Sequence, residues 1–150
     1  ILRPHIQSLK FDAVLIRKIE KNFKNFKNFK IQRENFSSKD LETSEYLITD
    51  WSGIGIEYAF AYERPVIYID TPKKIMNNKF NDISIEPLEC KIRNKIGITI
   101  KIDEVENILN FIDGLQLNKE EVVKNIQTMR NKYIYNFKKS GAEAYKLYCN

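Results

Sequence analysis

The chain has 150 residues, of which 43% are hydrophobic and 30% charged, and this composition argues against a disordered protein. No apolar run approaches the roughly 18 residues of a spanning helix, which argues against a membrane-spanning protein. Lysine and arginine number 25 against 20 acidic residues, giving a net charge of +5, which is modest for a nucleic-acid-binding protein but suits an anionic ligand or surface. Cys90 and Cys149 lack metal-ligand spacing and cannot build a disulfide framework, so we expect a reducing compartment. With a single histidine beside these two distant cysteines we expect no metal, and we name no cofactor.

The first five residues are typical of the end of a strand that runs into a turn. They read Ile-Leu-Arg-Pro-His, and Pro4 fixes the backbone just before His5. The chain also begins with Ile1 rather than methionine, so we expect residues 1–150 to be one domain taken from a longer protein.

Residues 8–23 carry apolar side chains at helical spacing, which predicts the first helix. The triplet Lys-Asn-Phe then occurs three times over residues 21–29, in a pattern that fits neither a helix nor a strand well. We interpret it as a helix end followed by a loop, with a short strand beginning at Phe29. The alternative is a basic, aromatic surface for nucleic acid or for a membrane.

The middle of the chain predicts one βαβ unit. Residues 46–49 form a compact apolar run, as in a parallel strand buried on both faces, and residues 66–69 form a second one. An apolar helix over residues 54–62 lies between them and ends at Arg64-Pro65. Such units build Rossmann-like α/β domains with helices on both faces of a mostly parallel sheet, and we predict this three-layer fold.

The remaining predicted elements are mostly helices. The first is a short helix that starts at Ser37 or Ser38 and ends before Tyr46, and a loop or irregular helix covers residues 73–82. An edge strand follows over residues 98–102, and then a helix that Asp103 caps and Gly114 stops. A long helix over residues 119–137 and a last helix over residues 142–148 complete the chain. No linker divides the sequence, so we expect a single domain.

The turn Asp50-Trp51-Ser52-Gly53 joins the carboxyl end of a predicted strand to the start of a helix. Open α/β sheets bind ligands at this edge, and the first N–H groups of such a helix are unpaired and attract anions. Ser52 would add a hydroxyl donor, and Gly53 would let a ligand approach the backbone. The turn therefore suits a phosphate or a diphosphate. The alternative is a serine that caps the helix beside a packing glycine.

Glu57 and His5 are further candidates. Glu57 lies on an otherwise apolar helix, where a carboxylate is costly to bury, so it would either accept hydrogen bonds from ribose hydroxyls or pair with a cation such as Arg64. His5 is the only histidine, and beside Arg3 at a strand end it could donate to a phosphate or act as an acid or base, unless its role is structural. The sequence contains no Walker loop and no Gly-x-Gly-x-x-Gly motif.

Four motifs occur in a fixed order along residues 1–72: Arg3-Pro4-His5, the Leu-Ile-Thr-Asp-Trp-Ser-Gly segment of residues 47–53, Glu57-Tyr58 and Arg64-Pro65-Val66-Ile67. In this order and spacing they resemble the C-terminal half of the CDP-glycerol glycerophosphotransferase family, the teichoic-acid-type polyol phosphate transferases. Residues 129–141 also resemble the closing helix of that family. The resemblance implies a GT-B architecture of two Rossmann-like domains, in which this chain would bind the CDP-activated donor.

The resemblance also implies roles for single residues. His5 would contact the donor diphosphate or assist its departure, and Arg3 would help to bind the nucleotide donor. Asp50 would shape the turn, and Ser52 and the Gly53 amide would hold phosphate. Glu57 would match the acidic residue that many GT-B enzymes use to bind ribose. Many members of the family have a second serine where this chain has Gly53, so one hydroxyl contact to the donor would be lost.

The implied reaction is attack of an acceptor hydroxyl on the β-phosphorus of a CDP-linked donor, which transfers a polyol phosphate and releases CMP. The acceptor would be a cell-surface glycan or a teichoic-acid-type polymer, reached by peripheral contact with the cytoplasmic face of the membrane. We expect no nucleic-acid partner, and we expect the 150-residue chain without the other half of a GT-B enzyme to bind nucleotide weakly and to catalyse nothing. Two alternatives stay open: a GT-B glycosyltransferase that uses a nucleotide sugar, and a non-catalytic basic module that binds nucleic acid or membrane.

Overall fold

The computed structural model describes residues 1–33, 38–73 and 79–149. The chain divides into two compact units, Ile1–Ser38 and Lys39–Asn150, which we describe one at a time. The predicted cap at Ser37 and residues 74–78 of the predicted loop over residues 73–82 fall outside the described residues. The expectation of one domain stays a prediction.

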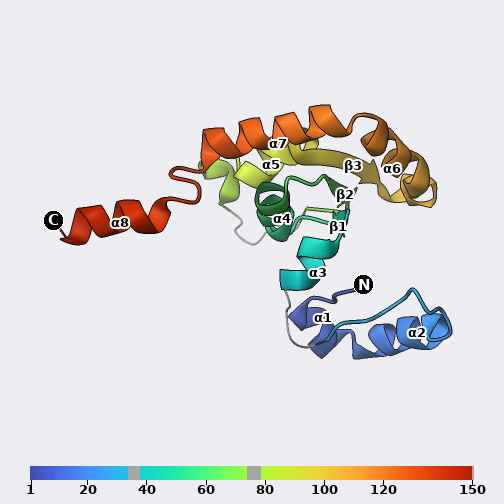
Figure 1. Ribbon diagram of the computed structural model, residues 1–150. Helices are drawn as coiled ribbons and strands as arrows, with labels where there is room; N and C mark the ends of the chain where they lie inside the picture. The colour runs from blue at the N-terminus through green and yellow to red at the C-terminus, as the bar shows by residue number, and fades with distance from the viewer. Residues whose placement is uncertain (34–37, 74–78, 150) are drawn as a thin grey trace. The chain divides into compact units, whose positions relative to one another are not determined.

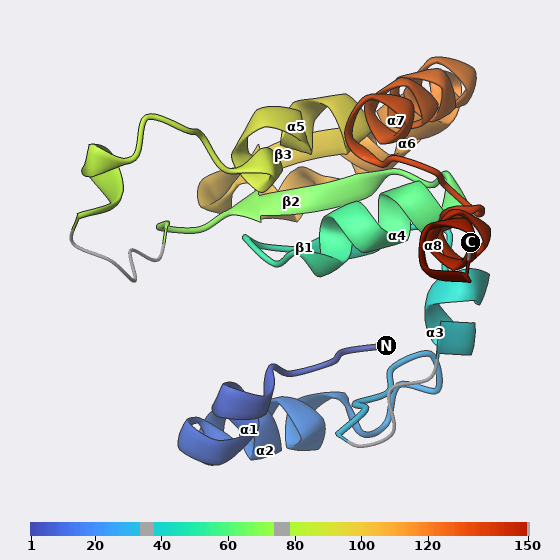
Figure 2. The same ribbon diagram turned by 90° about the vertical axis from the view of Figure 1, so that its left-hand side faces the viewer.

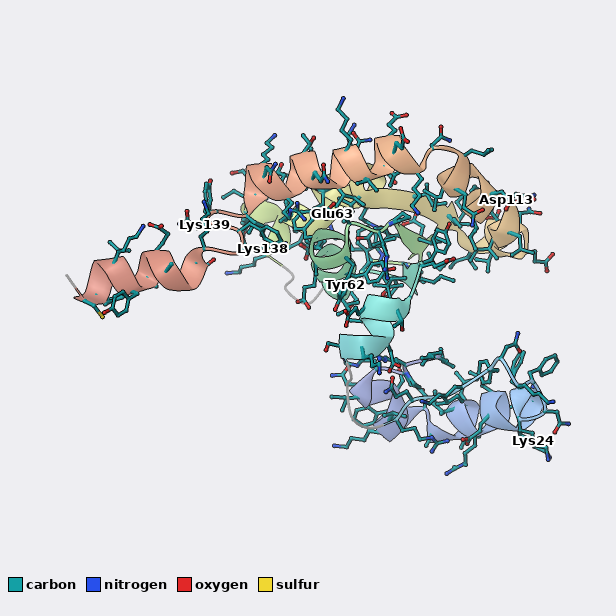
Figure 3. All side chains as sticks on the ribbon, viewed as in Figure 1. Lys24, Tyr62, Glu63, Asp113, Lys138 and Lys139 are labelled. Atoms are coloured by element: carbon teal, nitrogen blue, oxygen red, sulfur yellow. The ribbon has the colours of Figure 1, made fainter. Side chains whose placement is uncertain are left out.

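The first unit consists of two short helices and one backbone bridge. α1 (Ile6–Phe11) and α2 (Ala13–Phe23) replace the single helix predicted over residues 8–23, because the backbone leaves helical geometry at Asp12. The predicted strands at the two ends of this unit are reduced to one parallel bridge between Leu2 and Ile31. α2 ends within the Lys-Asn-Phe repeat, as predicted, and Figure 3 labels Lys24 just beyond its last turn.

The second unit contains a parallel sheet with the strand order β1-β2-β3 (Figures 1 and 2). Its strands are β1 (Leu47–Thr49), β2 (Val66–Asp70) and β3 (Gly97–Lys101). α4 (Ile54–Tyr62) connects β1 to β2, so the predicted βαβ unit is confirmed. Glu63 ends α4 in the left-handed conformation with φ of 54°, and Pro65 follows before β2 begins.

This unit contains further helices, of which α5 and α6 contact the strands. They are α3 (Ser38–Thr43), a 3₁₀ turn (Phe80–Asp82), α5 (Leu88–Ile96), a 3₁₀ segment (Ile102–Asn107), α6 (Ile108–Leu117), α7 (Lys119–Tyr133) and α8 (Ser140–Cys149). Figures 1 and 2 show α5 beside α7, and α4 beside the strands. None of the α8 side chains is buried.

Three predictions about these helices are wrong. Gly114 lies inside α6 instead of stopping it, because a single glycine costs a helix only about 1 kcal/mol. Asp103 lies within the 3₁₀ segment, whose N-cap is Lys101, and does not cap a helix. The predicted helix over residues 119–137 ends at Tyr133, where the chain becomes extended.

Neighbouring side chains of β2 pack into two separate hydrophobic clusters. Val66 and Tyr68 belong to a cluster with residues of α4, α5 and α7, whereas Ile67 belongs to a cluster with residues of β3 and α6. β1 lies at the edge of the described sheet, and its Ile48 is 52% exposed, so the prediction that this strand is buried on both faces is wrong. The unit is a mixed α/β structure with a small open parallel sheet, and the Rossmann-like three-layer fold remains a proposal.

The C-terminal end of α4 is held by Arg130, a partly buried arginine. Arg130 on α7 pairs with Glu63 at 2.7 Å, donates to the Phe60 carbonyl at 2.9 Å and lies with its guanidinium carbon 4.2 Å from the ring centre of Phe137. Hydrogen bonds from Gln127 and Arg130 hold the pKa of Glu63, labelled in Figure 3, below its usual value. These contacts lock the end of α4 that lies opposite the Asp50-Gly53 turn.

Candidate functional site

Arg3 and His5 belong to the first unit, where both have structural partners. The Nδ1 atom of His5 accepts the Gln7 N–H at 3.2 Å, so His5 is the N-cap of α1. Arg3 Nε donates to Gln32 Oε1 at 2.5 Å, close to the bridge between the two ends of the unit. Because Nδ1 accepts, a neutral His5 ring carries its proton on Nε2, and the exposed imidazole can offer this N–H to a ligand.

The other predicted residues lie in the second unit, at the carboxyl end of β1. Asp50, Ser52 and Gly53 are exposed there. The indole N–H of Trp51 donates to the Thr71 carbonyl at 2.7 Å, and Thr71 directly follows β2. The turn is therefore anchored to the carboxyl end of the neighbouring strand, which is the edge where open α/β sheets bind ligands.

The start of α4 leaves several donors open at this turn. Gly53 is the N-cap and no side chain caps the helix, so the alternative of a capping serine is wrong. A Cβ atom on Gly53 would meet nothing within 4 Å, so the alternative of a packing glycine is wrong as well. Within the described ranges, the N–H groups of Gly53 and Ile54 and the Ser52 hydroxyl have no hydrogen-bond acceptor, whereas the Gly55 N–H already bonds to the Ser52 carbonyl at 3.3 Å. These donors suit an anionic oxygen.

Glu57 lies exposed in the first turn of α4. The alternative pairing with Arg64 is wrong, because Arg64 donates to the Glu42 carbonyl and, at 2.6 Å, to the Ser44 carbonyl. No ion pair to Glu57 occurs in the part of the chain that the structure describes. Its carboxylate is available to accept hydrogen bonds from hydroxyl groups one helical turn away from Gly53.

Two cations that the sequence analysis did not single out lie near Trp51. The guanidinium carbon of Arg93 is 3.7 Å from the centre of the Trp51 ring, and Lys73 Nζ is 5.5 Å from it. Arg93 is only 5% exposed, although it is charged. Leu88, Ile92 and Ile96 recur every four residues and could have predicted α5. Arg93 follows Ile92 directly and precedes Ile96 by three positions, so the buried face of that helix includes it.

A surface hollow of about 370 Å³ lies elsewhere in the second unit, between α6, α7 and β3. Its polar lining consists of asparagines and one acid, Asn110, Asn118, Asn125 and Glu121. Without a cation it offers no charge complement to a phosphate, and it is distinct from the Asp50-Gly53 turn. Among the described residues, no group of three or more histidine, cysteine, aspartate or glutamate side chains could hold a metal ion.

Comparison of the chain with protein-family models, with curated proteins and with solved structures gives no match. The resemblance of residues 1–72 to the CDP-glycerol glycerophosphotransferases therefore stays a prediction.

Proposed function

We propose that the chain is the C-terminal, donor-binding domain of a glycerophosphotransferase-like enzyme with a GT-B architecture and a Rossmann-like three-layer fold. The observation that carries this proposal is the Asp50-Gly53 turn, where the open amides of Gly53 and Ile54 and the Ser52 hydroxyl follow one another at the carboxyl edge of a parallel sheet. This arrangement supports binding of the diphosphate of a CDP-linked donor. Glu57, one turn further along α4, would accept hydrogen bonds from the ribose.

In the proposed reaction, a hydroxyl of a cell-surface glycan or teichoic-acid-type acceptor attacks the β-phosphorus of the donor. The acceptor oxygen bonds to this phosphorus as the bond to the bridging oxygen breaks, the hydroxyl proton passes to a general base, and CMP leaves with the electron pair. Negative charge grows on the leaving phosphate, so donors at the turn stabilise the transition state. The role that the resemblance implies for His5 stays a prediction, because His5 belongs to the first unit and the turn to the second.

Calorimetric titration of the chain with CDP-glycerol, CDP-ribitol and UDP-sugars tests the donor class. We expect the two CDP-polyols to bind and the UDP-sugars not to bind; preference for a UDP-sugar would favour the alternative, a GT-B glycosyltransferase. Ser52→Ala removes a hydrogen bond to a charged oxygen, and we expect about tenfold weaker binding of the donor. Ser140→Ala, at an exposed serine at the start of α8, is the matched control. Unchanged affinity in both Ser52→Ala and His5→Ala would remove the proposed site.

The ribose contact has its own test. Glu57→Gln should weaken binding of CMP, which contains ribose, and leave binding of inorganic pyrophosphate unchanged or stronger, because the variant removes a negative charge near the anion. Equal weakening of both ligands would show that Glu57 supports the turn and does not contact a ribose.

The charge distribution supports peripheral contact of the first unit with an anionic membrane. Residues 1–38 contain nine lysines and arginines against three acids, a net charge of +6, whereas residues 39–150 contain 16 against 17, a net charge of −1. The same first unit exposes large apolar side chains, namely Ile6, Phe11, Val14, Leu15, Phe23 and Phe26. Basic and apolar side chains together are the composition of a segment that lies in the lipid interface. No helix in the described ranges is long and apolar enough to cross a membrane.

Sedimentation with vesicles of phosphatidylcholine, with and without phosphatidylglycerol, tests this contact. We expect binding only to the anionic vesicles, and a loss of binding when Lys21, Lys24 and Lys27 are changed to glutamine. Salt-dependent binding to DNA, lost in the same variant, together with no binding to vesicles, would favour the alternative of a nucleic-acid module.

A further inference from the structure

The guanidinium of Arg93 is buried with most of its donors unused. Its Nη1 atom lies 3.3 Å from Asp70, whose side chain is about half exposed, and this is its only ion pair in the described part of the chain. Nε and Nη2 are buried and have no hydrogen-bond partner. Leaving charged donors buried without an acceptor is costly, so this arrangement is stable only if something else offsets the cost.

Two aromatic rings enclose this guanidinium. Its central carbon lies 3.7 Å from the centre of the Trp51 ring and 4.9 Å from that of Tyr68, within the range of cation–π contacts. Trp51 is part of the Asp50-Gly53 turn, is only partly buried, and its indole N–H is held by the bond to the Thr71 carbonyl. The ring that covers Arg93 therefore belongs to the segment that would hold the diphosphate.

A third unused donor lies at the same place. The Tyr68 hydroxyl is buried without a hydrogen-bond partner, and a Cβ atom on Gly55 would lie 2.5 Å from its oxygen. Gly55 is in the first turn of α4, so the hydroxyl lies against the start of this helix. Burial raises the pKa of Tyr68 to about 12 despite the opposing effect of Arg93, so the hydroxyl keeps its proton at neutral pH and remains a donor.

We propose that Arg93 is the cation that binds the diphosphate at the Asp50-Gly53 turn, and that the Trp51 ring covers it until the anion arrives. This proposal rests on the proposed function, because it takes the turn as the diphosphate site. When the anion binds, the indole moves away from the guanidinium, and phosphate oxygens accept hydrogen bonds from Nε and Nη2. These two N–H groups form the planar fork that matches two phosphate oxygens. The Tyr68 hydroxyl donates a further hydrogen bond to the anion.

Trp51 is the only tryptophan of the chain, so its fluorescence reports on this site alone. Titration with inorganic pyrophosphate, followed by fluorescence and by calorimetry, should give the same dissociation constant by both methods. We expect Arg93→Gln to weaken binding at least about tenfold, and Arg93→Lys to recover part of the loss because it restores the charge without the fork. Lys95→Gln, an equal charge change at an exposed position of the same helix, should leave binding within about twofold of the wild type.

Tyr68→Phe keeps the test decisive if the Arg93 variants fail to fold. Removing a buried hydroxyl that has no partner should leave the unfolded fraction in urea unchanged or lower. The same variant should bind pyrophosphate several-fold more weakly, since the anion loses a donor. Normal folding with unchanged binding would show that this hydroxyl does not face the ligand. It would overturn the proposal that the anion binds beside Arg93 and Tyr68.

The remaining outcomes separate this inference from the proposed function. If Ser52→Ala weakens pyrophosphate binding while folded Arg93→Gln binds like the wild type, the diphosphate site stands and the role of Arg93 is wrong. If calorimetry detects binding and the fluorescence of Trp51 does not change, the covering role of Trp51 is wrong. If the wild-type chain binds neither pyrophosphate nor CDP-glycerol, both proposals fail together.

Discussion

Gly97 occupies a position where a single methyl group should disrupt the sheet. It begins β3 and lies directly opposite Val66 of β2 in the parallel register. A Cβ atom here would lie 1.8 Å from the Val66 carbonyl oxygen and 2.7 Å from the carbonyl carbon. The φ of Gly97 is 176°, which is extended backbone that alanine also adopts, so the obstacle to Gly97→Ala is steric contact and not a conformational requirement.

The magnitude follows from how far the backbone must move. Real Cβ atoms essentially never come closer than 3.0 Å to another heavy atom, so the strands must separate by about 1.2 Å at this pair. Neighbouring strands are about 4.8 Å apart, and a shift of this size breaks the hydrogen bonds at the start of the β2–β3 ladder. Overpacking costs about 1–3 kcal/mol and each lost hydrogen bond about 1 kcal/mol, so we expect a loss of about 3–5 kcal/mol. A domain of ordinary stability, about 5–15 kcal/mol, would be severely weakened.

Urea unfolding measured by the fluorescence of Trp51 is the assay, because this residue lies in the unit that contains the sheet. Gly114→Ala is the matched control, since a Cβ atom on Gly114 meets nothing within 4 Å and the residue lies inside α6. The control should raise the free energy of unfolding by about 0.5–1 kcal/mol, the usual gain for this change within a helix. A Gly97→Ala variant with the urea midpoint and slope of the wild type would refute the reasoning.

Two further predictions concern the contacts that hold α4. The pKa of Glu63 is lowered in the folded state by hydrogen bonds from Gln127 and Arg130, so its stabilising contribution is present above the unfolded value of about 4.5 and is lost as the pH falls through the folded pKa. The difference in the free energy of unfolding between the wild type and Glu63→Gln should therefore shrink below pH 4.5, and a difference independent of pH would contradict this. Tyr58→Phe removes the hydroxyl that donates to the Ser44 carbonyl at 2.8 Å and should cost about 1 kcal/mol, measured by urea unfolding. An unchanged midpoint would show that this bond does not stabilise the fold.

The sequence is most predictive where strong local signals agree with the tertiary structure. The apolar runs before and after α4, the turn between β1 and α4, and the break at Pro65 each predict an element boundary that the structure confirms. The prediction for Ile48 fails because an apolar run cannot show whether its strand lies at the edge or in the middle of the sheet. The predicted end of α7 is wrong because apolar spacing cannot show where a helix stops. The chain leaves the helix after Tyr133, although apolar residues continue at helical spacing to Phe137.

In the candidate site, too, the residues joined by local signals could be predicted from the sequence and the distant one could not. Ser52 and Gly53 could be identified from the chain because a strand, a turn and a helix start follow one another locally. Arg93 lies 40 residues beyond Gly53, and its burial beside Trp51 depends on how α5 packs on the sheet. Only the structure shows that the charged side chain is enclosed and incompletely paired.

The net charge of +5 is unevenly distributed along the chain, so it cannot support an anion site at the Asp50-Gly53 turn. The unit that contains the Asp50-Gly53 turn has a net charge of −1, whereas residues 1–38 have +6, so the overall excess is no argument for an anion at the turn. Fields of exposed charges are screened beyond about 8 Å at physiological ionic strength, so binding at the turn must depend on groups in direct contact, such as Arg93 and the amides of α4.

Binding of pyrophosphate should therefore weaken only slightly between 50 and 200 mM salt, because Arg93 is buried and poorly screened. Binding of the first unit to anionic vesicles should fall steeply over the same range. Equal salt dependence of the two would mean that the same exposed lysines carry both interactions.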